Sequence, residues 1–120
     1  MIAFISGHLD LSLDEFDDHY FPRIRTAWRN GHSFIVGDAK GADKLAQEFL
    51  EELGADYYVF HIGSKPRNAP KGCQKMGGFK SDDERDKAMT LRSDYDIAWV
   101  RPGREQSGTA KNLARRRKKA

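Results

Sequence analysis

Apolar residues along this chain gather in four short runs, each of which ends at a glycine or a polar turn. The runs are IAFIS at 2–6, SFIV at 33–36, YYVFHI at 57–62 and DIAWV at 96–100. Short continuous apolar runs bounded by turn signals are typical of strands that are buried on both faces. The sequence therefore predicts four buried strands.

Between these runs, apolar residues recur at helical spacing. Helices are predicted over 11–31, 41–53 and 81–93, and from about 107 onwards. Ser12 with Glu15, and Ser81 with Glu84, form capping boxes at the starts of the first and third helices. Pro22 predicts a kink or a break within the first helix, because proline lacks an amide hydrogen and clashes with the preceding turn.

Strands and helices alternate along 120 residues, which is the usual size of one domain. This alternation predicts right-handed crossovers and a mainly parallel sheet with helices on both faces. We therefore expect a single α/β domain over 1–120, a three-layer Rossmann-like sandwich with a sheet of about four to five strands. In such folds, ligands bind outside the carboxyl ends of the strands, where the strand order changes direction.

Three of the turns that follow the strands contain glycine and converge on that edge. Glycine lets the backbone approach a ligand closely, and the free amides of a following helix suit a phosphate or a carboxylate. One such turn alone can be a simple tight connection, but three together favour ligand binding. The candidate residues in these turns are Ser6, Gly7, His8, Gly37, Asp38, Gly41, Asp43, Ser107, Gly108 and Thr109.

The pattern differs from two common nucleotide-binding motifs. No GxGxxG opens the first helix and no GxxxxGK[ST] occurs, which disfavours ordinary NAD enzymes and P-loop NTPases. His19, His32 and His61 show no metal-ligand spacing, and the single Cys73 has no partner for a disulfide or a cysteine-based zinc site. We expect neither a metal ion nor a cofactor.

The formal net charge of +3 hides an asymmetry. Residues 1–100 carry 13 Lys and Arg against 17 Asp and Glu, whereas residues 101–120 carry 8 against 1. The basic tail at 113–120 allows nucleic acid binding, although most basic termini are simply solvated. The segment 63–80 has basic residues and no acid, and we predict a mobile loop there that is either solvated or a lid over an anionic ligand.

No stretch approaches the length of a membrane span, and the N-terminus lacks the features of a signal peptide. We therefore expect a soluble, cytoplasmic protein with no membrane partner. Phe16, Tyr20 and Trp28 recur along the first helix, where either core packing or a homo-oligomer interface would explain them.

Four blocks of the chain resemble the SLOG superfamily and the related LOG (lysine decarboxylase-like) and nucleoside deoxyribosyltransferase-like proteins. They are GDAKGADKLAQEFLEELG at 37–54, RDKAM at 85–89, SDYDIAWV at 93–100 and SGTAKNLARR at 107–116. The resemblance implies a Rossmann-like fold that binds nucleotides or their derivatives, with some members cleaving N-glycosidic bonds and others only sensing ligands. It implies ligand-facing turns at 6–7, 37–43 and 107–109, the last of them for phosphate. It also implies a ligand contact for Arg85, which by its neighbours alone is equally a surface ion-pair partner.

The chain departs from this pattern at one position. Hydrolytic members have a glutamate three residues after the threonine of the last turn, where this chain has Asn112. An amide cannot act as a nucleophilic carboxylate or a general base. Catalysis would need another carboxylate, for which Asp38, Asp43, Asp86 and Asp94 are available, and we take Asp38 and Asp43 as the candidates. The predicted function is binding or sensing of a nucleotide or nucleotide-derived ligand, with an N-glycosidase and a nucleic-acid-binding module as alternatives.

Overall fold

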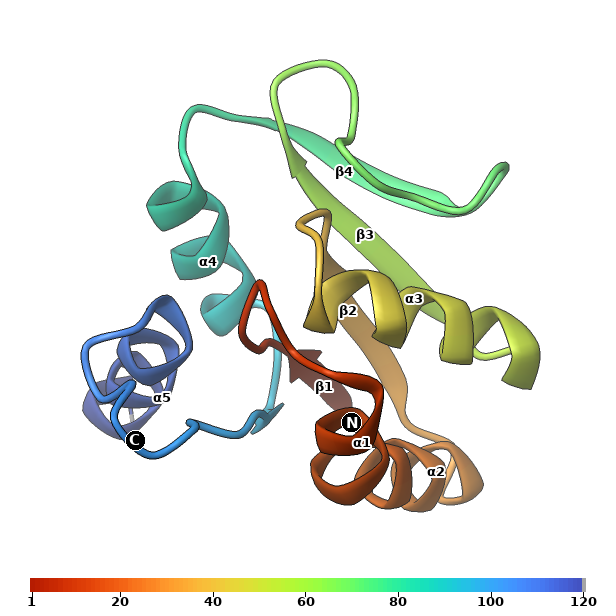
Figure 1. Cartoon of the computed structure of the whole chain (residues 1–120). Helices are drawn as coiled ribbons and strands as arrows, with labels where there is room; N and C mark the ends of the chain where they lie inside the picture. Colours follow the sequence, from red (N-terminus) through yellow and green to blue (C-terminus); the bar gives the residue numbers. More distant parts are fainter. Residues whose placement is uncertain (120) are drawn as a thin grey trace.

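The computed structural model describes residues 1–119, which form a five-stranded sheet with helices on both faces (Figure 1). The strands are β1 (Ile2–Ile5), β2 (Ser33–Gly37), β3 (Tyr57–Ile62), β4 (Gln74–Phe79) and β5 (Tyr95–Ile97). The helices are α1 (Leu13–His19), α2 (Phe21–Arg29), α3 (Ala42–Leu53), α4 (Asp82–Leu91) and α5 (Gly108–Lys119). The strand order is β4-β3-β2-β1-β5, and every neighbouring pair is parallel. The predicted three-layer Rossmann-like sandwich is confirmed.

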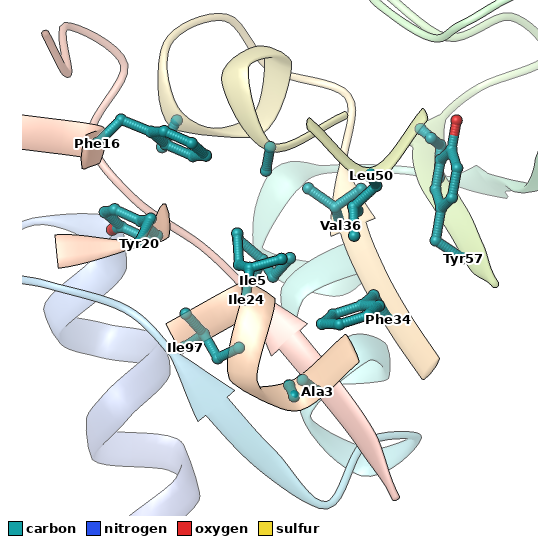
Figure 2. Packing of buried hydrophobic residues seen from close by; sticks show 14 of the residues in the cluster. Ala3, Ile5, Phe16, Tyr20, Ile24, Phe34, Val36, Leu50, Tyr57 and Ile97 are labelled. Carbon is teal, nitrogen blue, oxygen red and sulfur yellow. The ribbon is translucent and has the colours of Figure 1, made fainter. Parts of the chain in front are cut away.

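The two faces of the sheet carry separate hydrophobic clusters, because successive side chains of a strand point to opposite faces. The larger cluster lies beneath α1, α2 and α3, where Ile24 and Leu50 from the helices lie beside Ile5 and Val36 from the strands (Figure 2). The smaller cluster gathers under α4 on the other face: Phe4, Ile35, Phe60 and Met89. Figure 1 shows α4 and α5 together on this second face.

The predicted helix over 11–31 is two helices. Its capping box is present, because Ser12 Oγ accepts a hydrogen bond from the Glu15 amide at 3.1 Å and Glu15 Oε1 accepts one from the Ser12 amide at 3.0 Å. The break falls at Tyr20, and Pro22 lies in the first turn of α2. Proline is favoured in a first turn, so Pro22 starts a new helix instead of kinking an old one.

The segment 63–80 is not all loop, because β4 occupies 74–79 and pairs with β3 at the edge of the sheet. The sequence QKMGGF is polar and glycine-rich, so its strand conformation comes from pairing with β3 and not from its own propensity. A glycine is needed at position 77 of this strand, because a Cβ there would lie 2.1 Å from Cε1 of the His61 ring.

Two further predictions differ from the structure, the end of the fourth predicted strand and the capping box of the third predicted helix. β5 ends at Ile97, so the predicted strand residue Trp99 lies beyond it and stacks on His19 with ring centroids 3.9 Å apart. The third helix has its Ser81 cap, but the Glu84 carboxylate accepts from the Lys80 amide at 2.5 Å and so does not complete the capping box.

The predicted basic tail is largely helical, because α5 continues through it; Ala120 lies outside the described residues. Arg115 forms an ion pair with Asp83 of α4, and Arg116 forms one with Asp96 of β5 at 3.1 Å. Two of the tail's basic side chains are therefore used in holding α5 against the sheet and α4. Within residues 1–119, no helix has both the length and the apolar character that crossing a membrane requires.

Candidate functional site

A cavity of about 550 Å³ lies at the carboxyl ends of the strands, beside α4 and α5. The chain leaves β1 toward α1 on one face of the sheet and leaves β5 toward α5 on the other (Figure 1). Adjacent strands whose connections diverge in this way form the crevice in which open α/β sheets usually bind ligands. The cavity is therefore where the sequence predicts a site.

Most of the predicted site residues meet in this cavity. Its lining includes Ser6, Gly7, His8, Gly37, Asp43, Arg85, Ser107, Gly108 and Thr109. Asp38 and Gly41 do not line it: Asp38 is fully buried behind two arginines, and Gly41 supports the turn after β1. Arg67 also lines the cavity, and it belongs to the basic segment 63–80 for which the sequence left open a lid over an anionic ligand. Arg104 lines the cavity without any sequence signal, because it comes from an irregular segment that follows no periodic pattern.

The turn after β1 is fixed by Tyr20. The Tyr20 hydroxyl donates to the Ser6 carbonyl at 2.7 Å and accepts from the Trp99 amide at 3.1 Å, so it links the segments that follow β1 and β5. Burial raises the pKa of Tyr20 to about 12, which keeps this donor protonated. Gly7 leaves room for the arrangement, since a Cβ there would lie 2.4 Å from the Tyr20 oxygen and from the Ala42 side chain.

Asp38 is an anion that holds the site together. Its Oδ1 accepts from Arg85 Nη1 at 2.7 Å and from Arg67 Nη2 at 2.9 Å, while its Oδ2 accepts from the Arg67 amide at 2.8 Å. Burial alone would raise the pKa of Asp38, but the hydrogen bonds and charge of Arg67, with the charge of Arg85, outweigh it and lower the pKa. Both oxygens are therefore occupied by protein donors.

Both carboxylate oxygens of Asp86 also accept hydrogen bonds from protein donors, one of which is Asn112. Oδ1 of Asp86 accepts from Arg85 Nε at 3.1 Å and Nη2 at 3.0 Å, and Oδ2 accepts from Asn112 Nδ2 at 3.2 Å. Asn112 thus holds a carboxylate in the cavity wall. Asp94 does not belong to the site, because it accepts a hydrogen bond from the Ile2 amide at the start of β1, at the other end of the strand from the cavity.

Asp43 differs from these carboxylates. Its Oδ2 accepts from the Ala39 amide at 3.1 Å, and among the described residues its Oδ1 has no hydrogen-bond partner. Burial raises the pKa of Asp43 to about 7, with the Arg85 charge opposing the rise. Unlike Asp38, whose pKa is lowered, Asp43 can therefore exchange a proton near neutral pH.

Like Tyr20, His8 connects the turn after β1 to the segment after β5. Its Nε2 accepts from the Arg101 amide at 2.8 Å. Burial lowers the pKa of His8, and the charges of Arg101 and Arg104 lower it further, so the ring is neutral at pH 7.

The segment between β5 and α5 closes the other side of the cavity. Arg101 forms ion pairs with Glu15 at 2.7 Å and Asp10 at 3.1 Å, and Arg104 pairs with Asp10 at 2.8 Å. These contacts tie the segment to the start of α1. At its end, Ser107 caps α5 by accepting from the Ala110 amide at 3.2 Å, which places the first amides of α5 at the cavity wall.

The fold and the cavity together define a Rossmann-like α/β domain with a candidate ligand site at its switch point. In the part of the chain that the structure describes, no group of three or more His, Cys, Asp or Glu side chains is placed to hold a metal ion. Comparisons with models of known families, with curated proteins and with solved structures found no match. The resemblance to the SLOG superfamily stays a prediction from the sequence.

Proposed function

We propose that this protein binds a nucleotide or nucleotide-derived ligand in the cavity at the switch point. The observation that carries the proposal is the meeting, in one cavity, of the turn after β1 with the start of α5. Its volume of about 550 Å³ lies within the range of small-molecule sites. A helix start offers amides and partial positive charge to a phosphate, and the open Oδ1 of Asp43 in the cavity lining suits a hydroxyl group of a sugar.

The phosphate end of the ligand lies at α5 in this proposal. A Cβ added at Gly108 would meet nothing within 4 Å, so the first turn of α5 is open to an approaching group. Arg104 stands at the same wall, about half exposed, with only Asp10 as its ion-pair partner among the described residues. It can turn from that exposed carboxylate to a phosphate, because surface ion pairs are weak.

Arg104→Ala tests the phosphate assignment by calorimetric titration against nucleoside monophosphates, ADP-ribose and cyclic nucleotides. We expect the wild-type protein to bind at least one of them with a Kd below 1 mM, and the variant to bind it about tenfold more weakly, the usual effect of losing a charged hydrogen bond. Arg117→Ala is the matched control, since it removes the same charge from an exposed position on α5 and is expected to leave the Kd unchanged. Absence of sub-millimolar binding by the wild-type protein would contradict the proposal.

N-glycosidic hydrolysis is a second candidate, which the free oxygen and near-neutral pKa of Asp43 favour. A carboxyl group that titrates near the working pH can protonate a departing base or activate water. This activity predicts free base after long incubation with pooled nucleotides. If chromatography detects none, the second candidate is wrong and the binding proposal stands.

Asp43→Asn separates the two candidates and also tests the raised pKa. The variant is expected to release no base while still binding the ligand. A raised pKa means that the folded protein holds a proton which the unfolded chain loses near its usual pKa of 3.8, so Asp43 destabilises the fold increasingly as pH rises from about 4 to about 7. Unfolding in urea should therefore show the variant to be more stable than wild type by about 4 kcal/mol at pH 8, and hardly different at pH 4. A variant that gains no stability at pH 8 would show that Asp43 is an ordinary anion.

A further inference from the structure

The two ring nitrogens of His8 have different surroundings. Nε2 accepts from the Arg101 amide at 2.8 Å, and a backbone amide can only donate. Nε2 is therefore unprotonated, so the neutral ring carries its proton on Nδ1. The hydrogen bond that holds the segment after β5 fixes which nitrogen of His8 is a donor.

The donor on Nδ1 has no protein partner. Among the described residues no hydrogen bond involves it, although His8 is only 3% exposed and lines the cavity. Ser6 lies two residues earlier in the same cavity lining, and its buried Oγ also has no hydrogen-bond partner within the described part of the chain. Buried polar groups are normally satisfied, so the buried Ser6 Oγ lacks a partner that a ligand can supply. The Nδ1 of His8 on the same short turn lines the cavity and is open to the same ligand.

We propose that His8 Nδ1 donates a hydrogen bond to an oxygen or an unprotonated nitrogen of the bound ligand, while Nε2 holds the segment after β5 in place. The inference rests on the proposed function and adds the chemistry of the ligand group at the turn after β1. That group is an acceptor. A ligand amino group would face a donor that cannot become an acceptor, because moving the proton to Nε2 would oppose it to the Arg101 amide.

Two substitutions separate the roles of the two nitrogens. In His8→Gln, the side-chain carbonyl reaches the position of Nε2 and keeps an acceptor for the Arg101 amide, but the donor to the ligand is lost. In His8→Asn, the shorter amide keeps a donor near the position of Nδ1 and loses the contact with Arg101. We expect the Kd to rise about tenfold in His8→Gln and less than threefold in His8→Asn. A residue that only supports the fold would give the opposite order.

The probes are GMP, AMP and ribose 5-phosphate, titrated at pH 7 by calorimetry. An equal loss for all three in His8→Gln assigns the acceptor to the sugar phosphate. A loss confined to the nucleotides assigns it to the base, and a larger loss for GMP than for AMP assigns it to the keto oxygen that replaces the amino group of adenine. Each of these results supports the proposal. Unchanged binding of every probe by His8→Gln overturns the His8 proposal and leaves the proposed function intact. A wild-type protein that binds neither these probes nor ADP-ribose or a cyclic nucleotide overturns both.

A measurement on the wild-type protein keeps the test independent of whether the variants fold. Nitrogen NMR of the histidine-labelled protein should show His8 protonated on Nδ1, with a shift of that signal when a binding probe is added. The proposal is overturned if the proton is on Nε2, or if the chemical shift of Nδ1 stays unchanged at a saturating concentration of a probe.

Discussion

Arg85→Met is expected to lower the free energy of unfolding by about 3 kcal/mol at pH 7, because it removes a buried cation from the buried Asp38 and the partly buried Asp86. The Arg85 side chain is 7% exposed and donates to both Asp38 and Asp86. Methionine is also long and unbranched, so the lost stability comes mainly from the missing charge and hydrogen bonds of Arg85. Chemical unfolding at pH 7 measures the effect.

The comparison with Arg67→Met makes this prediction specific. Arg67 also binds Asp38, but its side chain is 48% exposed, so water can replace part of what is lost and the destabilisation should be less than half as large. The pH dependence follows from the lowered pKa of Asp38. Stability from such a group is present above its unfolded pKa, near 4, and is lost as the pH falls through the folded value. The gap between wild type and Arg85→Met should therefore narrow below about pH 4. Equal losses in the two arginine variants would contradict a buried role for Arg85.

The glycine turns could be predicted from the sequence because their signals are local. Gly7 follows β1, Gly37 ends β2 and Gly108 opens α5. Parallel topology brings the carboxyl ends of all strands to one edge. Knowing the elements was enough to place these turns together. The same argument failed for β4, whose strand conformation comes from β3 and not from its own residues.

The roles of the carboxylates could not be predicted, because they depend on partners that are distant in the sequence. Asp38 and Asp43 lie five positions apart at one turn, yet the arginines that bind Asp38 come from the loop after β3 and from α4. Those contacts make Asp38 a structural anion and leave Asp43 with a free oxygen. The prediction that placed both among the catalytic candidates therefore lacked the information that separates them.

The second large effect is expected at Gly41, which lies at the start of α3 with φ +73°. A Cβ there would lie 2.3 Å from the Leu9 carbonyl oxygen and 2.5 Å from that of His8, so alanine would have to push away the turn after β1. With ψ −124°, Gly41 lies outside the left-handed helical region, in a conformation that costs an L-residue about 1–3 kcal/mol, and overpacking adds about 1–3 kcal/mol. We expect Gly41→Ala to lower the free energy of unfolding by about 3 kcal/mol or more.

Gly54→Ala is the control for a positive φ without crowding, because Gly54 has φ +65° and ψ +33° and nothing within 4 Å of an added Cβ. It reports the cost of the αL conformation alone, about 1–2 kcal/mol. The difference between the two variants therefore measures the contact with the turn after β1 together with the added strain of ψ −124° at Gly41. The contact also has a functional consequence. The His8 carbonyl that accepts from the Ala42 amide would be displaced, so any Gly41→Ala protein that still folds should bind nucleotide more weakly than Gly54→Ala does. Equal stability losses and equal affinities in the two variants would show that the two turns do not depend on each other.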